Sequence, residues 1–201
     1  PDGDSIATFR YTSTATGIFE ITVSDNTEVI KEASQNITIN AMAASKMVII
    51  TPEREISAGD TSEIITIQLQ DDYDNPAVRS VNTVISLDSD TTGIFRDSLN
   101  TTDIEEIIIP LGKSEISFRY TSTAAAVHTL TVNDTVTVDP LPGDSQELTV
   151  NPLAPDTVIF TTDPRTISAG DTSEIITIQL KDMYNNVTVS NGGTTFNLGT
   201  D

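Results

Sequence analysis

The sequence Ile56-Ser57-Ala58-Gly59-Asp60-Thr61-Ser62-Glu63-Ile64-Ile65-Thr66-Ile67-Gln68-Leu69 occurs twice in this chain. The same fourteen residues return as Ile167 to Leu180, an offset of 111 residues (167 − 56). A second stretch, Phe9 to Thr14, returns as Phe118 to Thr123, an offset of 109 residues (118 − 9). These offsets exceed the roughly 20 to 50 residues of a solenoid repeat and match a β-sandwich domain of about 100 residues. The repeat therefore predicts a tandem array of β domains.

Apolar and polar residues alternate within each copy, as in a strand with one buried face. Ile65, Ile67 and Leu69 are expected to face the core, while Thr66 and Gln68 face outward. Turn residues separate seven or more such short runs, and no segment has the period of a helix. The fold class predicted is all-β, with tandem antiparallel β-sandwich domains. The other expected strands centre on Met47–Ile50, Ile85–Leu87, Phe95, Ile104–Ile109, Phe118, His128–Val132 and Leu148–Val150.

The two repeats divide the chain into three parts. Residues 1–40 match the back half of a repeat, residues 45–151 form a complete repeat, and residues 156–201 match a front half. The connections are short, and the second contains Pro152 and Pro155, which stiffen it. Two interpretations follow: a piece of a long array, or a filament subunit whose ends complement its neighbours. The two halves lack a counterpart of Thr91–Ile109, which counts against the second.

Composition excludes several classes of partner and chemistry. Ten basic and thirty acidic residues give a net charge of −20, which disfavours nucleic acid and anionic membrane surfaces. There is no cysteine, so thiol catalysis and zinc–thiolate sites are excluded. No run approaches 18 apolar residues, so direct membrane insertion is not expected.

The ordered motifs resemble a known family. Ser57-Ala58-Gly59-Asp60, followed by Ile65 to Pro76, resembles bacterial immunoglobulin-like repeats of the invasin/intimin type, which often read "AG…ITVQLxDxYGNP". Thr92 to Phe95, Ile108 to Ser114 and Phe118 to Tyr120 resemble the "TGxF…IPAGxSSxxFxY" half of such repeats. This version is common in long surface and S-layer-like proteins of bacteria and archaea. The resemblance implies an immunoglobulin-like sandwich from an exported, multi-domain surface protein, in which the repeats act as stalk or spacer.

One loop departs from the family pattern. The family's Gly in the YGNP loop is Asp74 here and Asn185 in the next copy, and Pro76 becomes Val187. Asp and Asn tolerate a left-handed backbone better than other residues with a side chain, so the same turn is expected.

The same loop holds the best candidate for a metal site. Its oxygen-bearing side chains are of the kind that calcium prefers, although their spacing is not that of an EF-hand. The next copy loses two carboxylates, which favours a plain turn over a metal site needed in every repeat. Structural calcium at a domain junction remains a hypothesis, and the acidic pairs Asp60/Glu63 and Asp171/Glu174 also stand beside turns. The candidate ligands are Asp71, Asp72, Asp74 and Asn75, and the next copy has Asp182, Met183, Asn185 and Asn186.

Other reactive residues point away from catalysis. The acids fall in turns and on outward strand faces, and the single histidine, His128, aligns with Phe19 (128 − 109), so its position tolerates an apolar ring. We therefore expect no enzyme activity. Four sequons are candidate glycosylation sites in a host that glycosylates, although their number is close to chance: Asn36, Asn100, Asn133 and Asn186.

The function expected is mechanical. Nearly identical copies suit an extracellular stalk or spacer, or the building block of a surface filament or layer, whose partners are neighbouring repeats. The alternative is an adhesive module that contacts carbohydrate or protein through loops at the end of the sandwich, with Tyr73 and Tyr184 as candidate binding residues. The absence of Trp counts against it, since binding hot spots favour Trp and Tyr. An accessory domain beside a secreted hydrolase is a third possibility.

Overall fold

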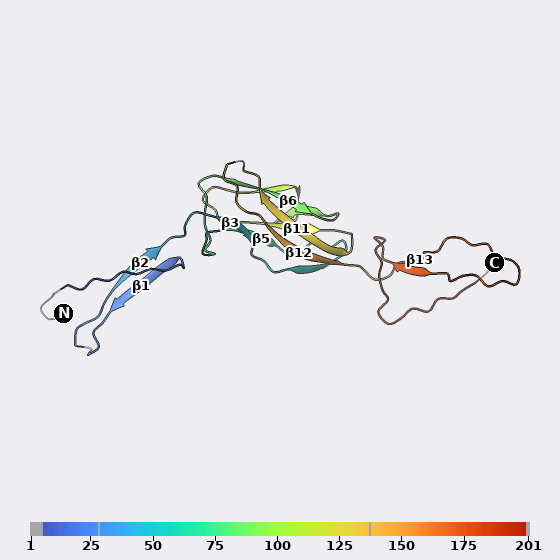
Figure 1. The fold of residues 1–201 in the computed structure, drawn as a ribbon, viewed down its shortest axis with the longest axis horizontal. Helices are drawn as coiled ribbons and strands as arrows, with labels where there is room; N and C mark the ends of the chain where they lie inside the picture. The colour runs from blue at the N-terminus through green and yellow to red at the C-terminus, as the bar shows by residue number, and fades with distance from the viewer. Residues whose placement is uncertain (1–5, 28, 137, 200–201) are drawn as a thin grey trace.

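The computed structural model describes residues 6–27, 29–136 and 138–199, whose regular structure is entirely β. Three parts follow one another along an extended molecule: the hairpin of β1 (Gly17–Val23) and β2 (Ala33–Ile39), a central sandwich, and the hairpin of β13 (Thr157–Phe160) and β14 (Ile178–Lys181) (Figure 1). Within the described residues, no helix is long and apolar enough to span a membrane.

The central sandwich consists of two five-stranded sheets, in the orders β3-β5-β10-β7-β8 and β4-β12-β11-β6-β9. All strand pairs are antiparallel except β4 with β12, which is parallel. The all-β prediction is therefore confirmed. The strands are β3 (Lys46–Ile49), β4 (Arg54–Ser57), β5 (Ile65–Gln70), β6 (Thr83–Ser89), β7 (Ile94–Asp97), β8 (Asp103–Ile104), β9 (Glu106–Ile109), β10 (Glu115–Thr121), β11 (Ala126–Asp134) and β12 (Asp144–Asn151).

The core lies between the two sheets and follows the predicted alternation. Ile65, Ile67 and Leu69 of β5 are fully buried, and residues of β10, β11 and β12 complete the same cluster. Burial of each large aliphatic side chain stabilises the fold by roughly 1.5–3 kcal/mol. The central part therefore has a hydrophobic core of its own.

Gln68 is more buried than the alternation predicts. Its side chain is only 8% exposed, although it alternates with the inward residues of β5. Gln68 donates to Glu115 Oε1 at 2.6 Å and accepts from Gln70 Nε2 at 2.8 Å. Polar neighbours on the same sheet therefore cover it, and a two-residue period alone cannot reveal that cover.

Each terminal hairpin reproduces a strand pairing of the sandwich. Phe19 pairs with Ile37 in the first hairpin, and their counterparts His128 and Leu148 pair in β11 and β12. Likewise, Thr157 pairs with Lys181 in the last hairpin, as Lys46 pairs with Gln70 in β3 and β5. Matching segments of the repeat thus take the same register each time.

The hairpins differ from the sandwich in what covers them. Phe118 is fully buried in the sandwich, whereas its counterpart Phe9 is 65% exposed. Ile49 is 8% exposed, whereas its counterpart Phe160 is 71% exposed. In the described residues, neither hairpin has a second sheet against it, so its apolar face is not enclosed.

Candidate functional site at the repeat junctions

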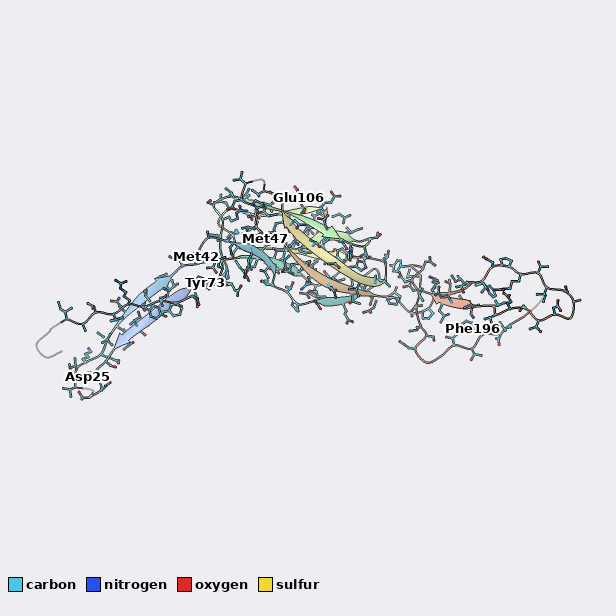
Figure 2. The ribbon with its side chains drawn as sticks, in the orientation of Figure 1. Asp25, Met42, Met47, Tyr73, Glu106 and Phe196 are labelled. Atoms are coloured by element: carbon cyan, nitrogen blue, oxygen red, sulfur yellow. The ribbon has the colours of Figure 1, made fainter. Side chains whose placement is uncertain are left out.

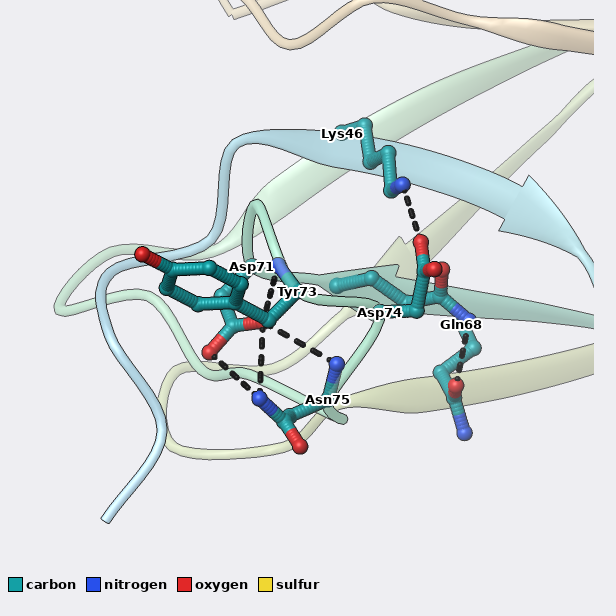
Figure 3. Close-up of polar contacts among 7 residues, drawn as sticks. Lys46, Gln68, Asp71, Tyr73, Asp74 and Asn75 are labelled. Atoms are coloured by element: carbon teal, nitrogen blue, oxygen red, sulfur yellow. Dashed lines mark hydrogen bonds and ion pairs between the residues drawn. The ribbon is translucent and has the colours of Figure 1, made fainter. Parts of the chain in front are cut away.

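The loop that follows β5 is organised by one buried carboxylate. Asp71 is 1% exposed, and its Oδ1 accepts hydrogen bonds from the backbone N–H groups of Tyr73 at 2.9 Å and Asn75 at 3.0 Å (Figure 3). The Asn75 side-chain amide also donates to both Asp71 oxygens at 3.1 Å. An aspartate that bonds backbone N–H groups two and four residues ahead fixes a tight turn. We call residues 71–75 the first junction loop.

Asp71 also holds the linker that precedes the sandwich. The backbone N–H of Met42 donates to Asp71 Oδ2 at 3.0 Å, and Met42 and Tyr73 lie between the first hairpin and the sandwich (Figure 2). Burial opposes ionisation of Asp71, but the hydrogen bonds from Asn75, Met42 and Tyr73 outweigh it and lower its pKa. The carboxylate form is therefore the one that the loop and linker stabilise.

Asn75 joins this loop to the first hairpin. Its side-chain N–H donates to the Thr14 carbonyl at 2.8 Å, and its Oδ1 accepts from the Thr16 N–H at 3.2 Å. Thr16 immediately precedes β1. One amide side chain thus clamps two repeats together through backbone groups.

The second junction repeats these bonds atom for atom. Asn186 donates to the Thr123 carbonyl at 2.8 Å and accepts from the Ala125 N–H at 2.9 Å. Asp182 accepts from the Leu153 N–H at 3.0 Å, as Asp71 does from Met42. Burial again opposes ionisation, and the bonds from Asn186, Leu153 and Tyr184 outweigh it and lower the pKa of Asp182. We call residues 182–186 the second junction loop.

Both junction loops need a left-handed residue at the same position. Asp74 has φ of 66° and Asn185 has φ of 68°. The prediction that Asp74 and Asn185 adopt a left-handed backbone in the same turn is therefore confirmed. Asp74 is also paired with Lys46 at the start of β3 (Figure 3).

Three of the four candidate calcium ligands already bond other protein groups, and the fourth is exposed to solvent. Asp71 accepts N–H groups on both oxygens, Asn75 is committed to the junction, and Asp74 is paired with Lys46, while Asp72 is exposed. Among the described residues, no group of three or more His, Asp or Glu side chains is arranged to hold a metal ion. Structural calcium at the junction stays a hypothesis, and the plain turn stays the favoured prediction.

The two acidic pairs lie outside these loops. Asp60 and Glu63 border a polar pocket of about 600 Å³ together with Arg54 and Glu55. Glu174, the counterpart of Glu63 in the next repeat, is paired with Arg165. Arg54 therefore lies near Asp60 and Glu63, as its counterpart Arg165 lies near Glu174.

The sequons lie in two different settings. Asn36 in β2, Asn133 in β11 and Asn100 in a turn are exposed and stay candidates for glycosylation. Asn186 is half-buried, and its amide donates to both Thr123 and Asp182. A glycan on Asn186 would replace one of these hydrogens, so its attachment requires an open junction.

His128 supports the second junction from inside the sandwich. The ring is fully buried, Nε2 donates to the Ala124 carbonyl at 2.9 Å, and Nδ1 accepts from the Tyr120 hydroxyl at 2.8 Å. Ala124 lies between Thr123 and Ala125, the two residues that hold Asn186. The histidine therefore braces the loop that receives the next repeat.

The candidate binding tyrosines belong to the junction loops. Tyr73 is 54% exposed, and Tyr184 is 39% exposed. Tyr184 lies against Gly59 of the sandwich, in contact range of its Cα hydrogens.

Sequence reasoning did not find the clamp, although the recurrence of Asp-x-x-x-Asn at 111 residues was a signal for it.

No family model matches this chain, and no curated protein matches it. Solved structures show a limited likeness. A glycosyl hydrolase family 2 member from Bacteroides cellulosilyticus is 16% identical with a TM-score of 0.44, over 67% of this chain and 18% of that one. Domains 1–6 of the surface layer protein SbsC are 12% identical with a TM-score of 0.38, over 88% of this chain and 21% of that one.

A conjugative transposon lipoprotein from Bacteroides eggerthii is 12% identical with a TM-score of 0.39, over 51% of this chain and 94% of that one. The chain thus spans about a fifth of the length of the two larger structures. Likeness at this level concerns the fold at most.

Proposed function

We propose that this chain is a run of immunoglobulin-like structural repeats from an extracellular cell-surface protein, where it acts as a stalk or spacer or as a building block of a filament or layer. The observation that carries the proposal is the junction made twice from the same atoms. Asn75 bonds Thr14 as Asn186 bonds Thr123, each at 2.8 Å. A repeated junction sets a repeated spacing.

The junction chemistry suits a spacer because it is independent of most surrounding side chains. Asp71, Asn75 and their counterparts bond backbone groups of the neighbouring segment, which every residue except proline can supply as donors. Repeats can therefore diverge elsewhere and still join. The net charge of −20 adds repulsion between neighbouring molecules in a crowded surface layer.

The adhesive alternative is less favoured. It needs the loop tyrosines free to meet a ligand, whereas Tyr184 is engaged with Gly59 of the preceding repeat. No catalytic role is proposed, since the buried acids Asp71 and Asp182 serve the junctions.

Distances between spin labels test the proposal. The chain has no cysteine, so Thr22→Cys with Ser145→Cys places two labels at exposed strand positions on either side of the first junction. Ser145→Cys with Thr157→Cys does the same across the second. A fixed-orientation spacer gives one narrow distance distribution across each junction. Broad distributions across both junctions would contradict the spacer and favour flexibly linked modules.

A further inference from the structure

The clamp is not the whole contact at the second junction, because Tyr184 approaches the sandwich beside it. A Cβ atom built on Gly59 would lie 2.5 Å from the Tyr184 hydroxyl oxygen and 2.9 Å from two of its ring carbons. Only glycine permits this approach. The tyrosine therefore occupies space that any other residue at position 59 would fill.

A matched glycine shows that this approach is specific to the junction. Gly170 is the counterpart of Gly59 in the identical fourteen-residue stretch and has nearly the same φ, 92° against 89°. A Cβ on Gly170 would meet no atom within 4 Å. The turn is the same in both copies, and the presence of Tyr184 is what distinguishes Gly59.

The residues around Tyr184 form a small pocket on the sandwich. Tyr184 lines a pocket of about 200 Å³ together with Gly59, Gly93, Thr121 and Thr123. The Thr123 carbonyl also accepts the Asn186 amide. We call Gly59, Gly93, Thr121 and Thr123 the socket; it lies directly beside the clamp.

Tyr73 shows the same loop against an incomplete socket. Thr12 and Thr14 are the counterparts of Thr121 and Thr123, but residues 6–16 contain no counterpart of Gly59. Tyr73 is accordingly 54% exposed, against 39% for Tyr184. The first clamp is made all the same, so the clamp and the socket are separable.

We propose that the socket of each repeat is a binding site for the tyrosine of the following repeat's Asp-x-Tyr-(Asp/Asn)-Asn loop, so that its partner is another copy of the repeat. This inference rests on the proposed spacer function and names the contact that fixes the angle between repeats. A tyrosine ring seated beside an asparagine clamp gives two points of contact, which restrict rotation where one would not.

Amide hydrogen exchange in the full chain tests the inference. The Ala125 N–H bonds Asn186 Oδ1 and so reports on the junction, while the amide of fully buried Leu130 reports on the sandwich itself. Tyr184→Ala is expected to speed exchange at Ala125 by about fivefold or more, without changing Leu130. Tyr73→Ala is the matched control and leaves Ala125 unchanged. An unchanged Ala125 in Tyr184→Ala overturns the inference.

The two glycines supply a second, independent test. Gly59→Ala and Gly170→Ala both strain a left-handed backbone, but only Gly59→Ala also displaces Tyr184. We expect Gly59→Ala to speed Ala125 exchange, Gly170→Ala to leave it unchanged, and the double variant Gly59→Ala/Tyr184→Ala to be no faster than Tyr184→Ala alone. Additive effects in the double variant would mean that the tyrosine does not occupy the socket.

The outcomes separate this inference from the spacer function. If Tyr184→Ala leaves Ala125 unchanged while the spin-label distances stay narrow, the socket fails and the spacer stands on the clamp alone. If the distances are broad in the unaltered chain, the spacer itself fails.

Discussion

Asn186 donates its side-chain amide to the carbonyl of Thr123 at 2.8 Å, which ties together two loops that are 63 positions apart in the sequence. The same amide donates to Asp182 and accepts from Ala125. One side chain thus links the carboxylate that shapes its own loop to the backbone of the preceding repeat. Substituting these residues one at a time measures what each contributes to the junction.

Asn186→Asp should loosen the second junction, because a carboxylate keeps the shape of the amide but cannot donate to Thr123 and repels Asp182. The loss corresponds to about 1–3 kcal/mol of junction free energy. We expect the spin-label distance across the second junction to broaden, with the first junction unchanged. Asn185→Asp is the control: it adds the same charge next door, at a position where Asp74 serves in the first loop. Equal broadening in both variants would point to charge alone.

Acid should loosen both junctions. The pKa values of Asp71 and Asp182 are lowered in the formed junction, so the ionised form stabilises it. That stabilisation is present above the ordinary aspartate pKa of 3.8 and is lost as the pH falls through the lowered value. We expect the spin-label distances to stay narrow at neutral pH and to broaden below about pH 3.8. Asp182→Asn should make the second junction loose already at neutral pH and insensitive to acid; a response identical to that of the unaltered chain would contradict this assignment.

Substitutions at Asp74 should separate backbone conformation from the ion pair with Lys46. Asp74→Ala places a residue with a Cβ and no polar side chain at φ of 66° and is expected to cost about 1 kcal/mol. Asp74→Asn keeps the tolerance for this backbone and loses only an exposed ion pair, which is worth about 0–1 kcal/mol. Urea unfolding of the unaltered protein and the two variants measures the difference in their free energies of unfolding. If Asp74→Asn is as destabilised as Asp74→Ala, the ion pair matters more than the backbone.

Most strands could be predicted from the sequence because their signal is local, but β4 was not expected, and the expected strand Ile104–Ile109 is divided between β8 and β9, which lie in different sheets. Ile65, Ile67 and Leu69 alternate with polar residues, and the register of each terminal hairpin follows from its similarity to a pair in the sandwich. The burial of Gln68 could not be predicted, since it depends on Glu115 from another strand.

The recurrence of Asp-x-x-x-Asn marks the residues of the clamp, but their partners could not be predicted because they are distant backbone groups. The Met42 N–H is 29 positions from Asp71, and the Thr14 carbonyl is 61 positions from Asn75. The sequence does not indicate which backbone N–H or carbonyl group a distant side chain will bond. Carboxylate and amide oxygens serve a calcium ion and an N–H donor equally well, so composition alone suggested metal where the structure has hydrogen bonds.

His128→Ala should destabilise the sandwich by about 2–4 kcal/mol, because it leaves a cavity and removes the partners of Tyr120 and Ala124. His128→Phe fills the cavity with the residue type found at the matching position, Phe19, and should cost less, about 1–2 kcal/mol, for the unpaired Ala124 carbonyl. Tyr120 keeps its hydrogen bond with Ser89 in both variants. Denaturant unfolding ranks the two, and an equal loss would mean that the hydrogen bonds outweigh packing.

Calcium should leave the melting temperature unchanged beyond what magnesium does. A calcium ion takes 6–8 oxygen ligands, yet both Asp71 oxygens already accept N–H groups and Asp74 is paired with Lys46. Any divalent ion screens a net charge of −20, so magnesium at the same concentration is the necessary control. A rise of several degrees that calcium produces and magnesium does not, and that Asp71→Asn abolishes, would show that the ion displaces these hydrogen bonds and that the junction loop is a calcium site after all.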